Sequence, residues 1–168
     1  MKIFSLLSIF LFLQSCYSFT GSSLSPETKT IQIKNFPNNT AFNPNLSQEF
    51  TVALQNRFLQ RTSLKGTNEN PDILIEGEIS DYQIAPTTIS NPVDADGGRI
   101  QAAQNKLTIT VKVRYENKIE KEKSFEKSFT DEANFNSDLD IYAIENQQTK
   151  LVYERLINKI FNEIVANW

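Results

Sequence analysis

The sequence has no histidine and only one cysteine among its 168 residues. The lack of histidine excludes catalytic triads that depend on it, a histidine general base and a histidine metal site. A single cysteine excludes an intramolecular disulfide and a zinc site of clustered cysteines. Only carboxylates, lysine, tyrosine and hydroxyl groups remain for chemistry, and the fold would have to assemble them. We therefore expect a protein that is not an enzyme and that needs no cofactor or metal.

A surplus of positive charge is also missing. The chain has 17 lysine and arginine residues against 20 aspartate and glutamate residues, which gives a formal charge of -3. Nucleic-acid-binding proteins usually concentrate positive charge on one face. The balance argues against a nucleic-acid partner, and the length fits a single domain with a core of ordinary size.

The N-terminal hydrophobic run is too short to cross a bilayer as a helix. It extends from Ile3 to Leu13 after the basic residue Lys2, whereas a spanning helix needs about 20 apolar residues. A short basic start, a short apolar stretch and a small residue before a cleavage site are typical of a secretory signal peptide.

The segment Leu13-Gln14-Ser15-Cys16 resembles the lipobox of bacterial lipoproteins. The resemblance implies that residues 1–15 are a lipoprotein signal peptide and that Cys16 becomes the lipidated first residue of the mature chain. Acyl chains on this cysteine would form a stable anchor, since each buried CH₂ contributes about 0.8 kcal/mol. The alternative is a leader without lipidation that has an incidental cysteine near its end. The residue directly after Cys16 is Tyr17 and not an aspartate, which by lipoprotein sorting rules indicates the periplasmic leaflet of the outer membrane.

Periodicity divides the mature chain into a flexible tether over residues 16–28 and a single α+β domain over residues 29–168. Every expected strand or helix has one apolar face, so the economical fold is a two-layer sandwich. It has two helices packed on one four-stranded mixed sheet, in the order β-α-β-β-β-α. The expected elements are a strand at 30–34, a helix from Asn45 that ends before Gly66, strands at 72–84, 106–116 and around Phe125 and Phe129, and a C-terminal helix ending near Trp168. Gly77 within the second strand indicates a bulge or a close approach of the backbone. The apolar stripe expected on the C-terminal helix consists of Leu156, Ile157, Ile160, Phe161, Ile164, Val165 and Trp168. The remaining segments are a polar loop at 86–99, a tight turn at 117–118 and an irregular stretch at 131–140.

Two carboxylates share the polar face of the second strand. Glu76 and Glu78 have a spacing that suits a general acid/base pair. The ordinary alternative, a solvated outer face, is the one we favour.

The strand at 106–116 alternates most clearly, and its polar residues are Lys106, Thr108, Thr110, Lys112 and Arg114. One interpretation is cross-strand pairing with Glu120, Glu122 and Glu126 of the next strand, where each pair contributes well under about 1 kcal/mol. In the other, this polar face lies against the wall of another protein, or its cations meet phosphates.

Four segments carry a resemblance to a known family: Ile31–Phe36, Asp72–Ile79, Lys106–Val113 and Val165–Trp168. They resemble the lipopolysaccharide-assembly lipoproteins of the LptE family, and the similarity extends over essentially the whole chain. The resemblance implies a non-enzymatic outer-membrane lipoprotein that plugs and supports the β-barrel LptD. There it would assist the transport of lipopolysaccharide and its insertion into the outer leaflet, with LptD and lipopolysaccharide as partners.

The resemblance also implies contacts with lipopolysaccharide or the barrel. On their chemistry, the candidates are Arg99, Lys106, Thr108, Thr110, Lys112 and Arg114. A second class stays open, because periplasmic lipoproteins that activate a peptidoglycan synthase share an extended strand, a helix and an Ile-rich strand with a Gly-Glu-Ile segment. The partner that co-purifies with the protein distinguishes the two classes.

Overall fold

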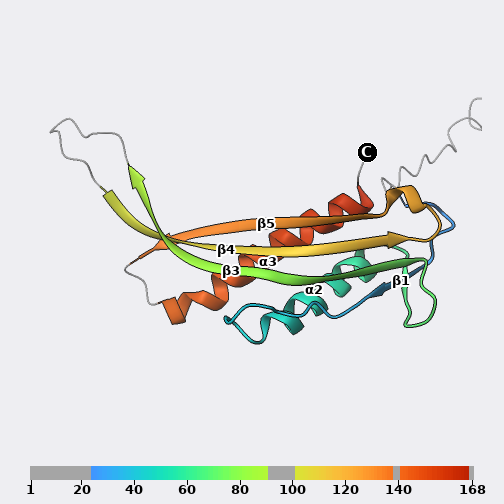
Figure 1. Cartoon of the computed structure of the whole chain (residues 1–168), viewed down its shortest axis with the longest axis horizontal. Coiled ribbons are helices and arrows are strands. Elements are labelled where there is room, and N and C mark those ends of the chain that lie inside the picture. Colours follow the sequence, from blue (N-terminus) through green and yellow to red (C-terminus); the bar gives the residue numbers. More distant parts are fainter. Residues whose placement is uncertain (1–23, 91–100, 138–140, 167–168) are drawn as a thin grey trace, which may run out of the picture.

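The computed structural model describes residues 24–90, 101–137 and 141–166. The expected signal peptide, Cys16, Arg99 and Trp168 therefore lie outside the described residues. The structure has two layers, a long curved sheet and two helices packed on one of its faces (Figure 1). In chain order the elements are β1 (Thr30–Ile33), α2 (Leu46–Arg61), β2 (Lys65–Gly66), β3 (Ile73–Ser90), β4 (Gln101–Asn117), the 3-10 helix η2 (Lys121–Lys123), β5 (Phe125–Asn136) and α3 (Ile141–Val165).

The sheet has five strands in the order β2-β1-β3-β4-β5. Strand β1 runs parallel to both β2 and β3, whereas β3, β4 and β5 form an antiparallel meander. The α+β class, the two helices and the mixed sheet are confirmed, and the prediction of four strands is wrong by one. The additional strand β2 has only two residues, so no periodic pattern marks it in the sequence.

The hairpin of β3 and β4 is longer than the sequence indicates. Strand β3 continues to Ser90 and β4 begins at Gln101, so the predicted polar loop is wrong over residues 86–90. The rest of that loop lies outside the described residues. Pro86 usually interrupts a strand, but here it pairs with Asn105 of β4, and none of the described strands lies beside it on the other side. Proline is tolerated at such an edge because its missing N–H breaks no ladder.

Strand β5 is also longer than predicted, because it continues to Asn136. The expected irregular segment at 131–140 is therefore wrong up to that residue, and its end lies outside the described residues. Asp131 obscures the pattern, since it stands in the row that faces α3, between buried Phe129 and Ala133. An inward-pointing charge is a common way to protect an edge strand from pairing with another chain.

The connection from β4 to β5 is broader than the tight turn predicted at 117–118. It contains η2, and the side-chain oxygen of Asn117 accepts the N–H of Glu120 at 2.8 Å. Glu120 and Glu122 lie in this connection. Of the three glutamates expected on the following strand, only Glu126 belongs to β5.

Helix α3 packs on β4 and β5, and its apolar stripe is confirmed. Its residues Leu156, Ile160 and Ile164 are buried, with exposed fractions of 0%, 0% and 4%. Phe161, which the stripe also included, is only partly buried and faces α2 instead. Its ring lies 5.1 Å from the ring of Phe58, so it joins the two helices rather than the helix and the sheet.

Gly77 marks a close approach of the chain, as expected from a glycine within a strand. Phe36, which is fully buried, packs over it after β1 ends. A register shift between Ile79 and Asp81 follows, so that the buried position moves to Tyr82. This bulge explains why the apolar alternation of β3 changes phase.

Candidate functional site

The sheet face away from the helices carries the candidate residues. Lys106, Thr108, Thr110, Lys112 and Arg114 are all at least partly exposed, because the residues between them are buried on the helix side. The prediction that they share one face is therefore confirmed. The outward residues of β5 continue this polar surface, and the hydroxyls of Thr110 and Thr130 lie 3.0 Å apart. We call this surface the outer face.

The cations of the outer face are held in ion pairs. Lys112 lies 3.2 Å from Glu78, and Arg114 lies 3.6 Å from Glu76. These glutamates belong to β3, where the register places them directly opposite the two cations. Cross-strand ion pairing was expected, but the prediction that Glu120 and Glu122 are the partners is wrong. In the part of the chain that the structure describes, neither of these glutamates forms an ion pair with a cation of the outer face.

Lys106 completes the set of paired cations. Its ammonium group lies 3.0 Å from a carboxylate oxygen of Glu132 on β5. The side chains of Lys112 and Arg114 are 56% and 60% exposed, and such exposed pairs contribute little to stability. The cations are thus neutralised locally but remain accessible from solvent.

An open hollow of about 510 Å³ lies on this face, between β4 and the segment that follows β1. Its charged lining consists of Lys34, Glu76, Glu78, Lys112, Arg114 and Glu126. We call it the outer-face hollow. Lys34, which the sequence-based list of candidates missed, lies 2.7 Å from Glu76, so this carboxylate bridges two cations. The alternation of β1 would have placed Lys34 on this face, next to the buried row.

Glu76 and Glu78, which both line the hollow, are not arranged as a catalytic pair. Glu76 accepts a hydrogen bond from the ammonium group of Lys34. Glu78 accepts a hydrogen bond from the side-chain amide of Asn39 at 2.7 Å and also forms an ion pair with Lys112. Both glutamates face solvent and each has a cationic partner. Their geometry is that of a solvated ion-pair network, which is the alternative that we favoured from the sequence.

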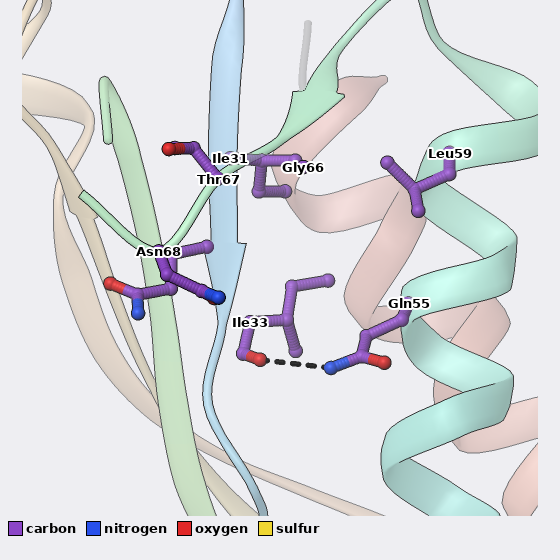
Figure 2. A pocket seen from close by; sticks show the side chains of 8 residues that line it. Ile31, Ile33, Gln55, Leu59, Gly66, Thr67 and Asn68 are labelled. Atoms are coloured by element: carbon purple, nitrogen blue, oxygen red, sulfur yellow. Dashed lines mark hydrogen bonds between the residues drawn. The ribbon is translucent and has the colours of Figure 1, made fainter. Parts of the chain in front are cut away.

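A second, uncharged cavity of about 230 Å³ lies between β1, β2 and α2 (Figure 2). Its lining combines apolar residues and Gly66 with amide and hydroxyl side chains. The lining residues are Ile31, Gln32, Ile33, Gln55, Leu59, Gly66, Thr67 and Asn68. Figure 2 shows Gln55 reaching from α2 to donate to the carbonyl of Ile33, at 3.0 Å. The sequence contains no signal for this cavity, because its walls come from three separate segments.

Side chains from α3 cover the free edge of β5. Lys159 donates to the carbonyl of Thr130 at 2.8 Å, and Arg155 donates to the carbonyl of Glu132. Both cations also lie 2.8 Å from Asp131. Burial by itself would raise the pKa of Asp131, but the hydrogen bond from Lys159 and the adjacent positive charges outweigh it and hold this pKa below its usual value. The edge is therefore blocked to a further strand at Thr130 and Glu132.

The buried tyrosine of the bulge has a structural role. The Tyr82 hydroxyl donates to Glu145 at 2.8 Å and lies 2.8 Å from the hydroxyl of Thr149, which joins β3 to α3. Burial raises the pKa of Tyr82, and the charge of Glu145 raises it further. The phenol therefore stays protonated and cannot act as a general base near neutral pH.

No group of acidic, histidine or cysteine side chains in the described residues is arranged to hold a metal ion. Within the same ranges, no helix is both long and apolar enough to cross a membrane.

A family model described as lipopolysaccharide-assembly, that of LptE, matches residues 28–167. The chain belongs to the LptE family. The match covers both helices and all five strands, and it confirms the resemblance seen in the four segments. The family match assigns the protein, a member of a lipoprotein family, to lipopolysaccharide assembly.

Several solved structures are similar to this chain at low sequence identity. PelC from Paraburkholderia phytofirmans, crystallised as a dodecamer, is 12% identical with a TM-score of 0.50, over 86% of this chain and 95% of that chain. Rare lipoprotein B from Shewanella oneidensis is 11% identical with a TM-score of 0.44, over 81% of this chain and 91% of that one. A minor lipoprotein from Acinetobacter baumannii is 15% identical with a TM-score of 0.47, over 81% and 90% of the two chains. No curated protein matches the sequence.

Proposed function

We propose that this LptE-family protein is a lipid-anchored, non-enzymatic plug of the outer-membrane β-barrel LptD. It supports the barrel in moving lipopolysaccharide into the outer leaflet. The family match over residues 28–167 carries the proposal. Residues 1–15 are removed, Cys16 bears the lipid, residues 16–28 are the tether, and the domain at 29–168 enters the barrel lumen from the periplasmic side.

The outer face is the surface that meets the barrel wall. The edge of β5 is covered by Lys159 and Arg155, and the carbonyl of Ile33 on β1 is covered by Gln55. A further strand cannot pair at these covered carbonyls, and the polar face is the surface that we propose for the contact with the barrel. The outer face is polar, as are the lumen walls of large outer-membrane barrels.

The cations of the outer face are the contacts for lipopolysaccharide phosphates. Lys106, Lys112 and Arg114 are accessible, and Arg99 follows the described end of β3. Lysine and arginine are the usual partners of phosphate groups. Thr108 and Thr110 lie between the cations and provide neutral hydrogen-bonding groups for the barrel.

Photo-crosslinking tests which protein is the partner. A photo-crosslinking residue at Thr108 or Lys112 is expected to capture LptD in a one-to-one complex, because both positions lie on the outer face. Positions Lys150 and Glu154, exposed on α3, serve as controls and should yield much less of the crosslinked barrel. Capture of an inner-membrane peptidoglycan synthase in place of a barrel would instead support the activator alternative.

Membrane fractionation tests the anchor. The Cys16→Ser variant should remain unlipidated and lose its recovery with the outer membrane, because the lipobox resemblance makes this cysteine the acylation site. The measurement is done in cells depleted of LptD, so that the barrel cannot retain the variant. Equal outer-membrane recovery of variant and parent would contradict lipidation at Cys16.

A further inference from the structure

We propose that Glu76 and Glu78 act as internal competitors of the phosphate ligand and set the selectivity of the outer-face hollow. They hold Lys34, Lys112 and Arg114 in ion pairs, and a ligand binds only if it takes these cations from them. The ligand class is a glycolipid headgroup that bears more than one phosphate. The inference rests on the proposed lipopolysaccharide contact and adds to it a role for the two carboxylates.

The geometry places the competing groups at the centre of the cation set. Glu76 lies 2.7 Å from the Lys34 ammonium group and 3.6 Å from the Arg114 guanidinium group, with one carboxylate oxygen toward each. Glu78 uses one oxygen for Lys112 at 3.2 Å and the other for the amide of Asn39 at 2.7 Å. Every carboxylate oxygen of Glu76 and Glu78 therefore has a donor, and three cations are paired with these two carboxylates. Glu126, which also lines the hollow, takes part in none of these pairs.

The strength of these pairs lies in the range where a ligand can displace them. Exposed ion pairs are weak because water screens the attraction between the two charges. A single phosphate must compete with both carboxylates, which are held beside the cations by the sheet. A headgroup with several phosphates can replace both at once, so the carboxylates discriminate against anions of low charge.

The carboxylates are also positioned by rigid elements. Glu76 and Glu78 lie on β3, which pairs with β4 along its whole length, so they stand opposite Arg114 and Lys112 by register. Gly77 between them permits the close packing of Phe36, which keeps the segment after β1 against β3. The competing groups therefore remain in place when the cations move to a ligand.

Binding measurements on the purified, non-acylated chain test the proposal. The probes are lipopolysaccharide in detergent and vesicles of phosphatidylglycerol, which carries one phosphate per headgroup. Glu76→Gln with Glu78→Gln should bind lipopolysaccharide about 3- to 10-fold more tightly than the parent, because the cations are released. The gain for phosphatidylglycerol should be larger, so that the preference for lipopolysaccharide narrows.

Two controls separate ion pairing from net charge. Glu49→Gln with Glu154→Gln removes the same charge from the helix layer and should leave both affinities within about twofold of the parent, because screening limits distant charges. Glu76→Asp with Glu78→Asp keeps the charge but shortens each side chain by one methylene, and should bind more tightly than the parent. Melting temperatures equal to that of the parent show that these variants are folded.

The outcomes separate this inference from the proposed function. In the first outcome, the parent binds lipopolysaccharide, the double variant Lys112→Glu with Arg114→Glu binds it more weakly, and the glutamine variant binds it more tightly. This result supports both the lipopolysaccharide contact and the competitor role. Parent binding with no gain beyond the helix-layer control overturns the competitor role and leaves the lipopolysaccharide contact standing. Parent protein that does not bind lipopolysaccharide overturns the contact itself, and the competitor role with it.

Discussion

Replacement of Gly77 by alanine is expected to destabilise the domain by about 3 kcal/mol or more. A methyl group at this position would lie 2.1 Å from the backbone carbonyl oxygen of Lys112 and 2.6 Å from the ring of Phe36. The carbonyl belongs to β4, which has a paired strand on each side, so it cannot move away without disturbing both ladders. For a domain of this size, the melting temperature should fall by roughly 6–12 °C.

Gly66→Ala is the matched control for this prediction. A methyl group at Gly66 meets only the Leu59 side chain, at 3.8 Å, which is an ordinary van der Waals contact. Its melting temperature should equal that of the parent or rise slightly, because alanine has fewer unfolded conformations to lose. A Gly77→Ala protein that melts as the parent does would show that β3 and β4 are not packed as closely as described.

The second large effect is expected for Ile160→Ala, at about 2–5 kcal/mol. Ile160 is fully buried where α3 packs on the sheet, so truncation leaves a cavity in the core. Leu151→Ala, on the same helix but 44% exposed, is the control and should cost little. Thermal or denaturant unfolding measures both, and equal midpoints for the two variants would contradict the placement of α3. Phe161→Ala should lower the free energy of unfolding by less than the loss of a fully buried phenylalanine would, because Phe161 is only partly buried.

The inward and outward residues of β4 could be predicted from the sequence because the signal is local. A strand turns successive side chains to opposite faces, and only one face of this sheet is covered by helices. The alternation from Lys106 to Tyr115 therefore reports directly which residues are buried. The stripe of Leu156, Ile160 and Ile164 follows for the same reason from the helical period.

The limits of the strands could not be predicted, because neighbouring elements decide them. Pro86 continues β3 only because no described strand lies beside it to require its missing N–H. Asp131 continues β5 because Arg155 and Lys159 reach it from α3. Strand β2 exists only because Thr30 and Ile31 offer it a partner. For Asp131 and for β2 the stabilising group lies far away in the sequence, and for Pro86 the deciding feature is the position of the other strands.

The sequence by itself determined the fold class, the family resemblance and the membership of the polar row on β4, since these depend on periodicity and on local motifs. Only the tertiary structure decided the partners of the cations. The strand register sets Glu76 opposite Arg114 and Glu78 opposite Lys112, whereas Glu120 and Glu122, which lie nearer in sequence, remain in the turn. An ion pair requires closeness in space, and in an antiparallel sheet that closeness is set by register rather than by separation along the chain.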